Sequence, residues 1–364
     1  MRELLDGNAA IVRGALAAGC TFFAGYPITP ASGILMAMMR ELPRCGGVAI
    51  QGEDEIASIG MCIGAAMAGA RAMTATSGPG ISLYSENIGL AIMGEVPLVI
   101  VDVQRLGPAT GGATTVGQGD VQFVRWGTSG GYPIIALAPS SVAECYSVTA
   151  KAFELAERFR CPVFVLTDKE VAMTLATVEA DAFPPVEVRP RVLAAAGAPY
   201  AYQPAADVPP MRRYGRGERV RFTGSTHDER AMITRQPPTV DALNRHLAAK
   251  IEEHADELEL VEADAMPGAT TLVVSYGVTA GAARIAVQLA RREGRAVSGL
   301  VIQGLWPVPE RAIGLAMEGV ERVVVPELNL GQYRREIERL AAGREVVGVN
   351  RVDGELIDPE QVLE

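Results

Sequence analysis

Cysteine, histidine and lysine are scarce in this 364-residue chain, and their scarcity excludes several kinds of site. The five cysteines are scattered and never spaced Cys-x-x-Cys, so the sequence offers no evident ligand set for an iron–sulfur cluster or a structural zinc. With only three histidines, no Ser-His-Asp, Cys-His or His-Glu-x-x-His arrangement is suggested. A chain this poor in proton-transfer groups indicates an organic cofactor that carries the chemistry.

The charge balance and the hydropathy exclude two further kinds of partner. The net charge of −10 argues against nucleic acid, because phosphate binding depends on clustered Lys and Arg. No segment approaches the ~20 unbroken apolar residues of a membrane span. Residues 1–19 predict an amphipathic helix without a signal-peptide cleavage pattern. We therefore expect a cytoplasmic protein whose cysteines are reduced and serve as small core residues.

Strand-like and helix-like segments alternate from residue 1 to residue 185. The apolar runs are continuous rather than alternating with polar residues, which predicts a parallel sheet covered by helices on both faces. The predicted strands lie at 21–27, 47–51, 71–77, 97–104, 133–139 and 161–168. The fold class is therefore α/β.

The rest of the chain divides into a connector and a second α/β unit. Residues 186–264 form the connector, which is Pro-, Gly- and Arg-rich up to about 240 and continues as a predicted helix over 239–264. Residues 265–364 form the second unit, with strands predicted at 270–277, 296–309, 320–329 and 345–354. His246 and His254 lie in the charged helix and are expected to be solvated, whereas His227 stays a functional candidate among turn residues and charges.

Four loops of the first unit follow a predicted strand and carry functional groups. Ligands of parallel α/β sheets bind beyond the carboxyl ends of the strands, where loop amides and helix N-termini converge. In chain order these loops present Thr29, then Glu53, Asp54 and Glu55, then the Ser77-Gly78-Pro79-Gly80 turn, and finally Arg105. The sequence thus places a hydroxyl, an acidic cluster, a glycine-rich turn and a guanidinium at one edge.

Structural explanations are available for several of these residues. Thr29 can be a turn residue between prolines that fix the loop, and acids that open a helix are favourable with its dipole. The Ser-Gly-Pro-Gly turn has neither the G-x-G-x-x-G fingerprint nor a Walker lysine. Glu55 differs because a helix rich in Gly and Ala follows it at 56–70. Such a helix can pack closely on a sheet or on a second subunit, so we expect the Glu55 carboxylate to be partly buried.

Long collinear motifs resemble the alpha subunit of 2-oxoacid:ferredoxin oxidoreductases, and the 2-oxoglutarate-type (KorA-like) branch most of all. They are Gly-Tyr-Pro-Ile-Thr-Pro at 25–30 and the stretches 51–83, 99–127 and 223–231, and similarity continues through the second unit. The resemblance implies a thiamine-diphosphate pyrimidine-binding domain at 1–185. It also implies a domain like the C-terminal domain of transketolase at 265–364.

The same resemblance implies roles for individual residues. Glu55 matches the glutamate that hydrogen-bonds the aminopyrimidine of thiamine diphosphate and so acts in catalysis, while Thr29 and Arg105 match residues that bind the substrate carboxylate. Further cofactor contacts are expected from Tyr26, Pro27, Ser77 and Gly78. A beta subunit would carry Mg²⁺, the diphosphate site and a [4Fe-4S] cluster, sometimes with gamma and delta subunits. Coenzyme A would accept the acyl group and ferredoxin the electrons, and this chain alone would be inactive.

Two stretches depart from the pattern of the 2-oxoglutarate-type branch and leave the substrate open. Residues 128–139 lack an Asp-His pair, and Gly-Gly-Ala-Thr-Thr at 111–115 replaces a Thr-Lys-Pro-like sequence. A branched-chain, aryl or other 2-oxoacid such as pyruvate therefore stands beside 2-oxoglutarate. Other readings are a non-oxidative thiamine-dependent decarboxylase, a non-catalytic assembly subunit, and a dinucleotide-binding dehydrogenase. Against the dehydrogenase, no G-x-G-x-x-G motif follows any predicted strand of this sequence.

Overall fold

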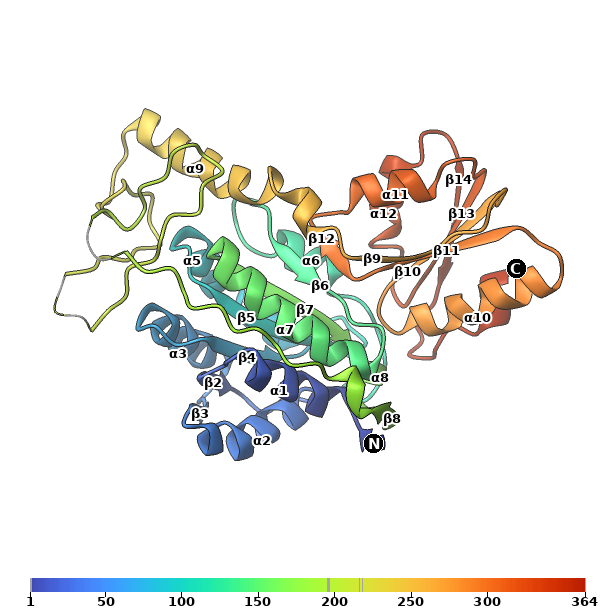
Figure 1. The fold of residues 1–364 in the computed structure, drawn as a ribbon, viewed down its shortest axis with the longest axis horizontal. Helices are drawn as coiled ribbons and strands as arrows, with labels where there is room; N and C mark the ends of the chain where they lie inside the picture. The colour runs from blue at the N-terminus through green and yellow to red at the C-terminus, as the bar shows by residue number, and fades with distance from the viewer. Residues whose placement is uncertain (1, 195–196, 216, 218, 364) are drawn as a thin grey trace.

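The computed structural model describes residues 2–194, 197–215, 217 and 219–363. It contains two α/β units side by side, and α9 (Pro237–Glu252) runs from the connector back toward the second unit (Figure 1). The first unit has a seven-stranded sheet with the order β12-β6-β7-β5-β4-β2-β3. Its strands are β2 (Phe22–Gly25), β3 (Val48–Gln51), β4 (Ala72–Thr76), β5 (Leu98–Gln104), β6 (Ile135–Leu137), β7 (Pro162–Asp168) and β12 (Gly304–Trp306). All are parallel except β12, so the predicted parallel sheet is confirmed.

Helices cover both faces of this sheet because its strands are apolar on both sides. Along β5, Val99 and Val101 pack in one core cluster and Leu98 and Ile100 in the other, since successive side chains point to opposite faces. The first face is covered by α1 (Gly7–Ala17), α2 (Ser32–Glu41) and α7 (Val142–Phe159). The second face is covered by α3 (Glu55–Met67), α5 (Ser85–Met93) and α6 (Val121–Trp126). Short helices complete the unit at α4 (Pro79–Leu83), α8 (Lys169–Met173), η1 (Pro43–Cys45) and η2 (Ala180–Ala182).

The N-terminal helix begins later than predicted. Residues Arg2–Leu5 form β1, which pairs antiparallel with β8 (Ala176–Glu179). Asp6 is the N-cap of α1, and its carboxylate accepts a hydrogen bond of 2.8 Å from the Ala9 amide. This cap fixes the start of the helix and leaves the preceding residues free to extend.

The second unit has a five-stranded sheet of order β14-β13-β10-β11-β9. Its strands are β9 (Val261–Asp264), β10 (Thr271–Ser275), β11 (Val297–Ile302), β13 (Arg322–Glu327) and β14 (Glu345–Asn350). One face packs on α10 (Thr279–Arg292) and α13 (Pro359–Leu363), and the other on α11 (Glu310–Ala316) and α12 (Arg334–Leu340). Within the part of the chain that the structure describes, no helix is long and apolar enough to cross a bilayer.

The prediction of one helix over 239–264 is wrong at its C-terminal end. The helix α9 ends at Glu252, η3 (Ala255–Leu258) follows, and the last four residues form β9. This strand pairs antiparallel with β11, with Val261 opposite Ile302. Pairing with the sheet edge outweighs the helix propensity of a segment rich in Glu, Ala and Leu.

The strand predicted over 296–309 is also divided between the two units. It stays in the second sheet up to Ile302, and then Gly304–Trp306 pairs antiparallel with β6 of the first sheet. The Trp306 indole donates a hydrogen bond of 3.1 Å to the Val121 carbonyl. A strand from the second half of the chain therefore completes the edge of the first sheet.

Buried polar side chains also join the two units by hydrogen bonds. The Asp168 carboxylate accepts hydrogen bonds from the Val171 amide of its own unit and from the Val278 amide of the second, at 3.0 and 2.9 Å. Burial raises the pKa of Asp168 to about 6, although these two hydrogen bonds oppose the increase. Gln118, fully buried, accepts a bond from the Leu328 amide and donates one to the Tyr276 carbonyl. The units are thus fixed to each other by hydrogen bonds as well as by apolar contacts.

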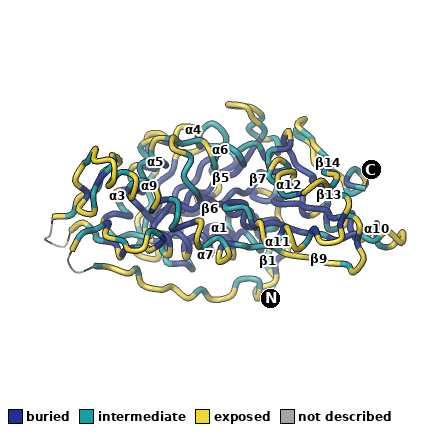
Figure 2. The backbone as a smooth tube through the Cα atoms, turned by 90° about the horizontal axis from the view of Figure 1, so that it is seen from above, coloured by how far each residue is buried: buried dark blue, intermediate teal, exposed yellow. Residues whose placement is uncertain are grey.

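The described connector residues are irregular over most of 183–236, as expected, and lie against the first unit. Buried segments run through the middle of both sheets, whereas much of the connector is exposed (Figure 2). Arg191 holds the connector in place, because its guanidinium donates to the Ala66 and Ala70 carbonyls at the end of α3. The same guanidinium forms a bidentate ion pair of 2.6 Å with Glu157 of α7.

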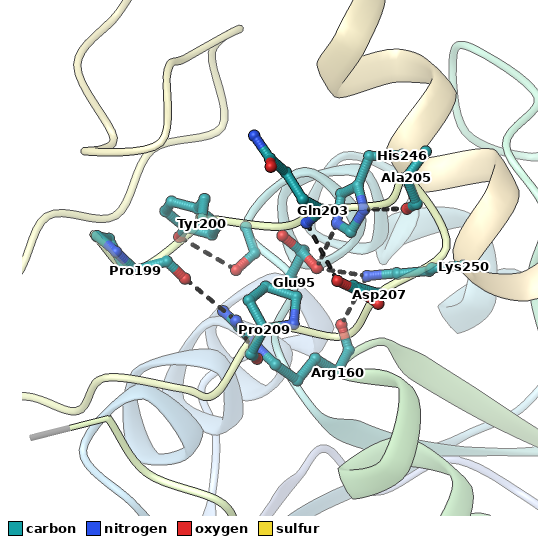
Figure 3. Close-up of polar contacts among 11 residues, drawn as sticks. Glu95, Arg160, Pro199, Tyr200, Gln203, Ala205, Asp207, Pro209, His246 and Lys250 are labelled. Carbon is teal, nitrogen blue, oxygen red and sulfur yellow. Dashed lines mark hydrogen bonds and ion pairs between the residues drawn. The ribbon is translucent and has the colours of Figure 1, made fainter. Parts of the chain in front are cut away.

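A buried ion-pair network anchors α9 and the connector (Figure 3). One carboxylate oxygen of Glu95 accepts from His246 Nε2 at 3.0 Å and from Lys250 Nζ at 2.8 Å. His246 is fully buried and stacks on Tyr202, so the prediction that it is solvated is wrong. The Arg160 guanidinium extends the network by donating to the carbonyls of Pro199 and Pro209. Sequence pattern alone missed this role because the partners lie on separate segments.

The charge balance of the network favours ionised Glu95. Burial by itself would raise the pKa of Glu95, but the charges of Lys250 and Arg160 and the His246 hydrogen bond lower it below the ordinary value. A lowered pKa in the folded state stabilises the fold above the ordinary pKa of a glutamate. That contribution is lost as the pH falls below this value.

We expect Glu95→Gln to lower the free energy of unfolding by about 3–5 kcal/mol at neutral pH, because it leaves buried cations without their carboxylate. Denaturant unfolding followed by circular dichroism measures the change. Glu318→Gln, at an exposed position, is the matched control and should stay within about 0.5 kcal/mol of the wild type. A variant of Glu95 that unfolds like this control would show that the network contributes little to stability.

Candidate functional site

The predicted site residues converge at one edge of the first sheet. The strands β2, β3, β4 and β5 are parallel and adjacent, so their carboxyl ends open at the same side. Four loops follow those strands and carry the predicted residues Thr29, Glu55, Ser77 and Arg105. The candidate functional site lies among these loops.

Glu55 is the first residue of α3, and its carboxylate points inward. The side chain is buried, with 7% of its surface exposed. A Cβ atom placed on Gly80 would lie 3.1 Å from its Oε1 atom and 2.0 Å from Thr76 Oγ1. The Glu55 carboxylate therefore lies against the Gly80 backbone, next to the hydroxyl at the end of β4.

The two neighbouring acids do not reach the interior, and Asp54 has a structural role. Asp54 is the N-cap of α3 and accepts a hydrogen bond of 2.7 Å from the Ala57 amide. Its backbone carbonyl also accepts from the Ser58 hydroxyl. Glu53 and Asp54 are both exposed, so Glu55 is the member of the acidic cluster that reaches the interior.

Two buried hydroxyls at the end of β4 have no hydrogen-bond partner within the described residues. They belong to Thr76 and Ser77, both of which are fully buried. Gly78 follows with φ of 51°, a backbone conformation that favours glycine. Buried hydroxyls normally have partners, so unpaired ones at a strand edge are suited to a bound polar ligand.

Arg105 closes the site on the side of β5. Its side chain is buried, and its Nη1 atom donates a hydrogen bond of 2.6 Å to the Thr29 carbonyl. The Nε atom has no partner within the described residues and packs against Gly78, where an added Cβ would lie 2.9 Å away. The guanidinium thus retains capacity to bind an anion.

The loop that carries Thr29 is held from both sides. Arg105 binds the Thr29 carbonyl, and Asn8 of α1 donates to the Pro30 carbonyl at 3.2 Å. Thr29 is half-buried, whereas Tyr26 and Pro27 are exposed at the mouth of the site. The structure therefore brings Thr29, Glu55, Ser77, Gly78 and Arg105 together, with Tyr26 and Pro27 at the rim.

Sequence reasoning missed four residues that support the site. Tyr84 is fully buried below Glu55, and its hydroxyl lies 2.7 Å from Thr74 Oγ1. Burial raises the pKa of Tyr84 well above its ordinary value, and the nearby Glu55 carboxylate adds to the increase. Thr76, Asp102 and Asp120 complete the set. The even spacing of Thr74 and Thr76 on β4 was the available signal for this polar face.

His227 lies away from this edge. It is buried in the connector, its Nδ1 atom is 2.9 Å from the Ser225 carbonyl oxygen, and its ring packs on Tyr200. It lines a cavity of about 400 Å³ together with Tyr202 and Pro238, and none of the strand-edge residues lines that cavity. His227 is thus packed within the connector, and its Nε2 atom is buried without a partner among the described residues.

The loop at 111–115 is shaped by backbone contacts. The Gly112 amide donates to the Leu106 carbonyl at 2.8 Å, and the Leu106 amide donates to the Thr115 carbonyl at 3.0 Å. Gly111 has φ of 48°, and a Cβ there would lie 1.8 Å from the Leu106 carbonyl oxygen. This compact loop extends from Arg105 toward the second unit, where Thr115 contacts Gly354.

The fold and this edge define an α/β protein whose ligand site lies at the carboxyl ends of parallel strands. Residues 13–245 match the thiamine diphosphate-binding domain of pyruvate flavodoxin/ferredoxin oxidoreductases, and residues 269–362 match core domain II of pyruvate:ferredoxin oxidoreductase. The chain belongs to this oxidoreductase family.

Relatives locate the chain more narrowly, in the KorA-like branch. It is 43% identical over 362 residues to 2-oxoglutarate synthase subunit KorA of Methanocaldococcus jannaschii, covering 99% of this chain and 98% of that one. It is 38% identical to ketoisovalerate oxidoreductase subunit VorB of Methanothermobacter thermautotrophicus, covering 100% and 96%. The resemblance found in the sequence motifs is thereby confirmed.

Solved structures agree with this assignment. The 2-oxoglutarate:ferredoxin oxidoreductase from Magnetococcus marinus, with 2-oxoglutarate, coenzyme A and succinyl-CoA bound, superposes with a TM-score of 0.93 at 32% identity. That match covers all of this chain and 64% of the other, so this chain spans less than two thirds of that protein's length. A split-gene transketolase superposes with a TM-score of 0.54 at 11% identity, covering 98% and 94%, and supports the fold alone.

We expect Gly80→Ala to lower the free energy of unfolding by about 1–3 kcal/mol, because the added methyl overlaps Thr76 Oγ1 and the Glu55 side chain. Gly60→Ala in α3 is the matched control, since nothing lies within 4 Å of an added Cβ there. It should raise stability by about 0.5–1 kcal/mol, as expected for replacing a glycine inside a helix. Equal effects in denaturant unfolding would contradict the close packing at Gly80.

Proposed function

We propose that this chain is the alpha subunit of a thiamine-diphosphate-dependent 2-oxoacid:ferredoxin oxidoreductase. The reaction is the oxidative decarboxylation of a 2-oxoacid, with 2-oxoglutarate favoured, to an acyl-coenzyme A thioester. The observation that carries the proposal is the buried Glu55 carboxylate beside two unpaired hydroxyls and a buried arginine. Similarity to KorA subunits along the full chain supports the same assignment.

The residues at the strand edge fit one half of thiamine diphosphate. Glu55 is suited to hydrogen-bond the aminopyrimidine ring, and the Ser77 hydroxyl, Gly78, Tyr26 and Pro27 surround the remaining space. When bound, the cofactor supplies a nucleophilic carbon and an electron sink for decarboxylation. A buried carboxyl at the start of a helix can hold a proton on a ring nitrogen, which is the task of Glu55 here.

Arg105 and Thr29 are proposed to bind the substrate carboxylate. The buried guanidinium has an unpaired Nε atom, and its hydrogen bond to the Thr29 carbonyl fixes both residues relative to each other. A charge-assisted hydrogen bond from arginine would orient the 2-oxoacid for loss of carbon dioxide. The low exposure of Arg105 excludes competing water.

A beta subunit is proposed to complete the site. It would supply Mg²⁺, the diphosphate contacts and a [4Fe-4S] cluster, with ferredoxin as electron acceptor and gamma or delta subunits as further partners. Four of the five cysteines here are buried singly, and burial raises the pKa of Cys20 to about 12 and of Cys161 to about 12. Such thiols are suited to packing rather than to binding a cluster.

The exposed face of α3 is proposed as part of the contact with this partner. Ile56 is half-exposed, and Gly60, Gly64 and Ala68 follow it at four-residue intervals on the same face. An added Cβ at Gly60 or Gly64 would meet nothing within 4 Å. A partner backbone can therefore approach this helix closely, next to Glu55.

There is a second candidate for the substrate, which differs in its side chain. Similarity to a ketoisovalerate oxidoreductase subunit, together with the departures at 111–115 and 128–139, supports a branched-chain 2-oxoacid as the alternative. Both substrates present the same carboxylate and 2-oxo group to the strand edge. The difference lies in what contacts the side chain.

The test is to purify the complex from its own host through a tag on this chain and assay it. Viologen reduction with coenzyme A and a panel of 2-oxoacids should be fastest with 2-oxoglutarate. A complex that contains thiamine diphosphate but no iron would indicate a non-oxidative decarboxylase. A complex with neither would indicate a non-catalytic assembly subunit.

We expect Glu55→Gln to keep the fold and to slow hydrogen exchange at C2 of bound thiamine diphosphate by at least 100-fold, on the order of a lost general acid–base group. Nuclear magnetic resonance after deuterium quench measures this exchange in the purified complex. The exposed neighbour provides the control, because Glu53→Gln should leave the exchange rate unchanged. Unaltered exchange in the Glu55 variant would remove that residue from the mechanism.

A further inference from the structure

Two carboxyl groups lie together beneath Arg105, and the proposed reaction does not use them. Asp102 belongs to β5, opposite Thr76 of β4 in the parallel register, and is fully buried. Its side chain shares a face with Leu98 and Ile100, because residues two apart on a strand point the same way. That face is the one covered by α3 and α5.

Asp120 meets Asp102 from the start of α6. Its backbone amide donates to Gln104 Oε1 at 3.1 Å, which fixes it beside the end of β5. Asp120 is half-buried, and its Oδ2 atom is buried without a partner among the described residues. Both oxygens of Asp102 are likewise without a donor in this part of the chain. The charged groups that act on the Asp102 carboxyl are the neighbouring Asp120 and the Arg105 guanidinium.

Both oxygens of the fully buried Asp102 lack a donor among the described residues, which favours the protonated form of this carboxyl group. Two adjacent carboxylates removed from water cannot both be ionised, so one of them holds the proton at neutral pH. Burial, followed by the neighbouring Asp120, raises the pKa of Asp102 well above its ordinary value. Burial also raises the pKa of Asp120 to about 6, and Arg105 opposes both increases.

The charged and titratable side chains on the surrounding elements are Arg105 at the end of β5, Glu55 on α3, Tyr84 before α5, Asp168 on β7 and Arg125 on α6. Arg105 is the cation that acts on both carboxyl groups. No hydrogen bond joins it to either Asp102 oxygen or to Asp120 Oδ2 within the described residues. The singly protonated pair and the guanidinium offset each other's charge before any ligand binds, and Glu55 is a further carboxyl group at the same edge.

We infer that Asp102 and Asp120 form a proton-sharing pair that acts through Arg105 and takes up a second proton when a substrate carboxylate binds. This inference rests on the proposed binding of a 2-oxoacid at Arg105. The incoming carboxylate adds a negative charge to a buried site that already holds the pair and Glu55. Protonation of the second carboxyl group, with the proton supplied by solvent, offsets that added charge. The pair is a positioning device for Arg105 and does not touch the substrate.

The linkage has a definite direction with pH. Below about pH 6 the pair already holds both protons, so 2-oxoacid binding is independent of pH there. Above this value each binding event takes up a proton, and the Kd rises by up to about tenfold per pH unit. The reaction rate at saturating substrate does not follow this dependence, because the bound state is already protonated.

The first experiment needs no substrate. Infrared spectra of the full chain, wild type minus Asp102→Asn, should show the carbonyl stretch of a buried protonated carboxylic acid that persists at pH 8. Asp256→Asn, which removes an exposed carboxylate, is the control and should remove no such band. Absence of the band from the wild-type difference spectrum overturns the proton-sharing pair, whatever reaction the protein performs.

The second experiment measures proton uptake in the purified complex. Isothermal titration with 2-oxoglutarate at pH 7.5, in two buffers of different ionisation enthalpy, should detect uptake in the wild type and none in Asp120→Asn. The KM of that variant should also lose its dependence on pH, while the pH profile of kcat is retained.

The outcomes separate this inference from the proposed function. If the complex oxidises 2-oxoglutarate without proton uptake, the linkage is wrong and the proposed function stands. If the infrared band is present but no 2-oxoacid binds or reacts, the proposed function is wrong, and the substrate linkage with it. A purely structural role for the aspartates would lower stability in both variants and leave the pH dependence of KM unchanged.

Discussion

Parallel pairing of β2, β4 and β5 is the constraint on which the site depends. The register places Thr76 beside Asp102 and brings the loops after all three strands to one edge. Because the strands are buried on both faces, Glu55, Thr76 and Arg105 at that edge are removed from water. The carboxylate of Glu55, the hydroxyl of Thr76 and the guanidinium of Arg105 therefore interact through protein rather than through solvent, where their electrostatic effects are stronger.

Few of these groups are fully paired within the described residues, although buried polar groups normally are. Backbone contacts fix the surrounding loops: Arg105 binds the Thr29 carbonyl, and Asp54 caps α3. The side-chain atoms left without a partner at this edge include Ser77 Oγ, Thr76 Oγ1 and Arg105 Nε. A binding site built this way is ordered before the ligand arrives, which lowers the entropic cost of binding.

Local patterns in the sequence predict the strands and the edge, and long-range pairing explains what they miss. Continuous apolar runs and the Pro- or Gly-bounded loops after them identify Thr29, Glu55 and Arg105. Asp102 escapes notice because it interrupts an apolar strand. Its neighbour Asp120 is distant in the sequence pattern and becomes adjacent only through the fold. Glu95 and His246 are 151 residues apart, and no periodicity links them. The segment that becomes β9 has helical composition and is extended only because an edge of the second sheet accepts it.

The strand β12 follows β11 of the second sheet in the chain but pairs with the first sheet. This arrangement has a consequence for synthesis on the ribosome. β6 is the edge strand of the first sheet until Gly304–Trp306 pairs with it, and those residues leave the ribosome long after the other six strands. During that interval a nascent chain exposes an apolar, unpaired edge, the kind of surface that aggregates. Truncation between the units would leave the same edge of the first sheet without its partner strand.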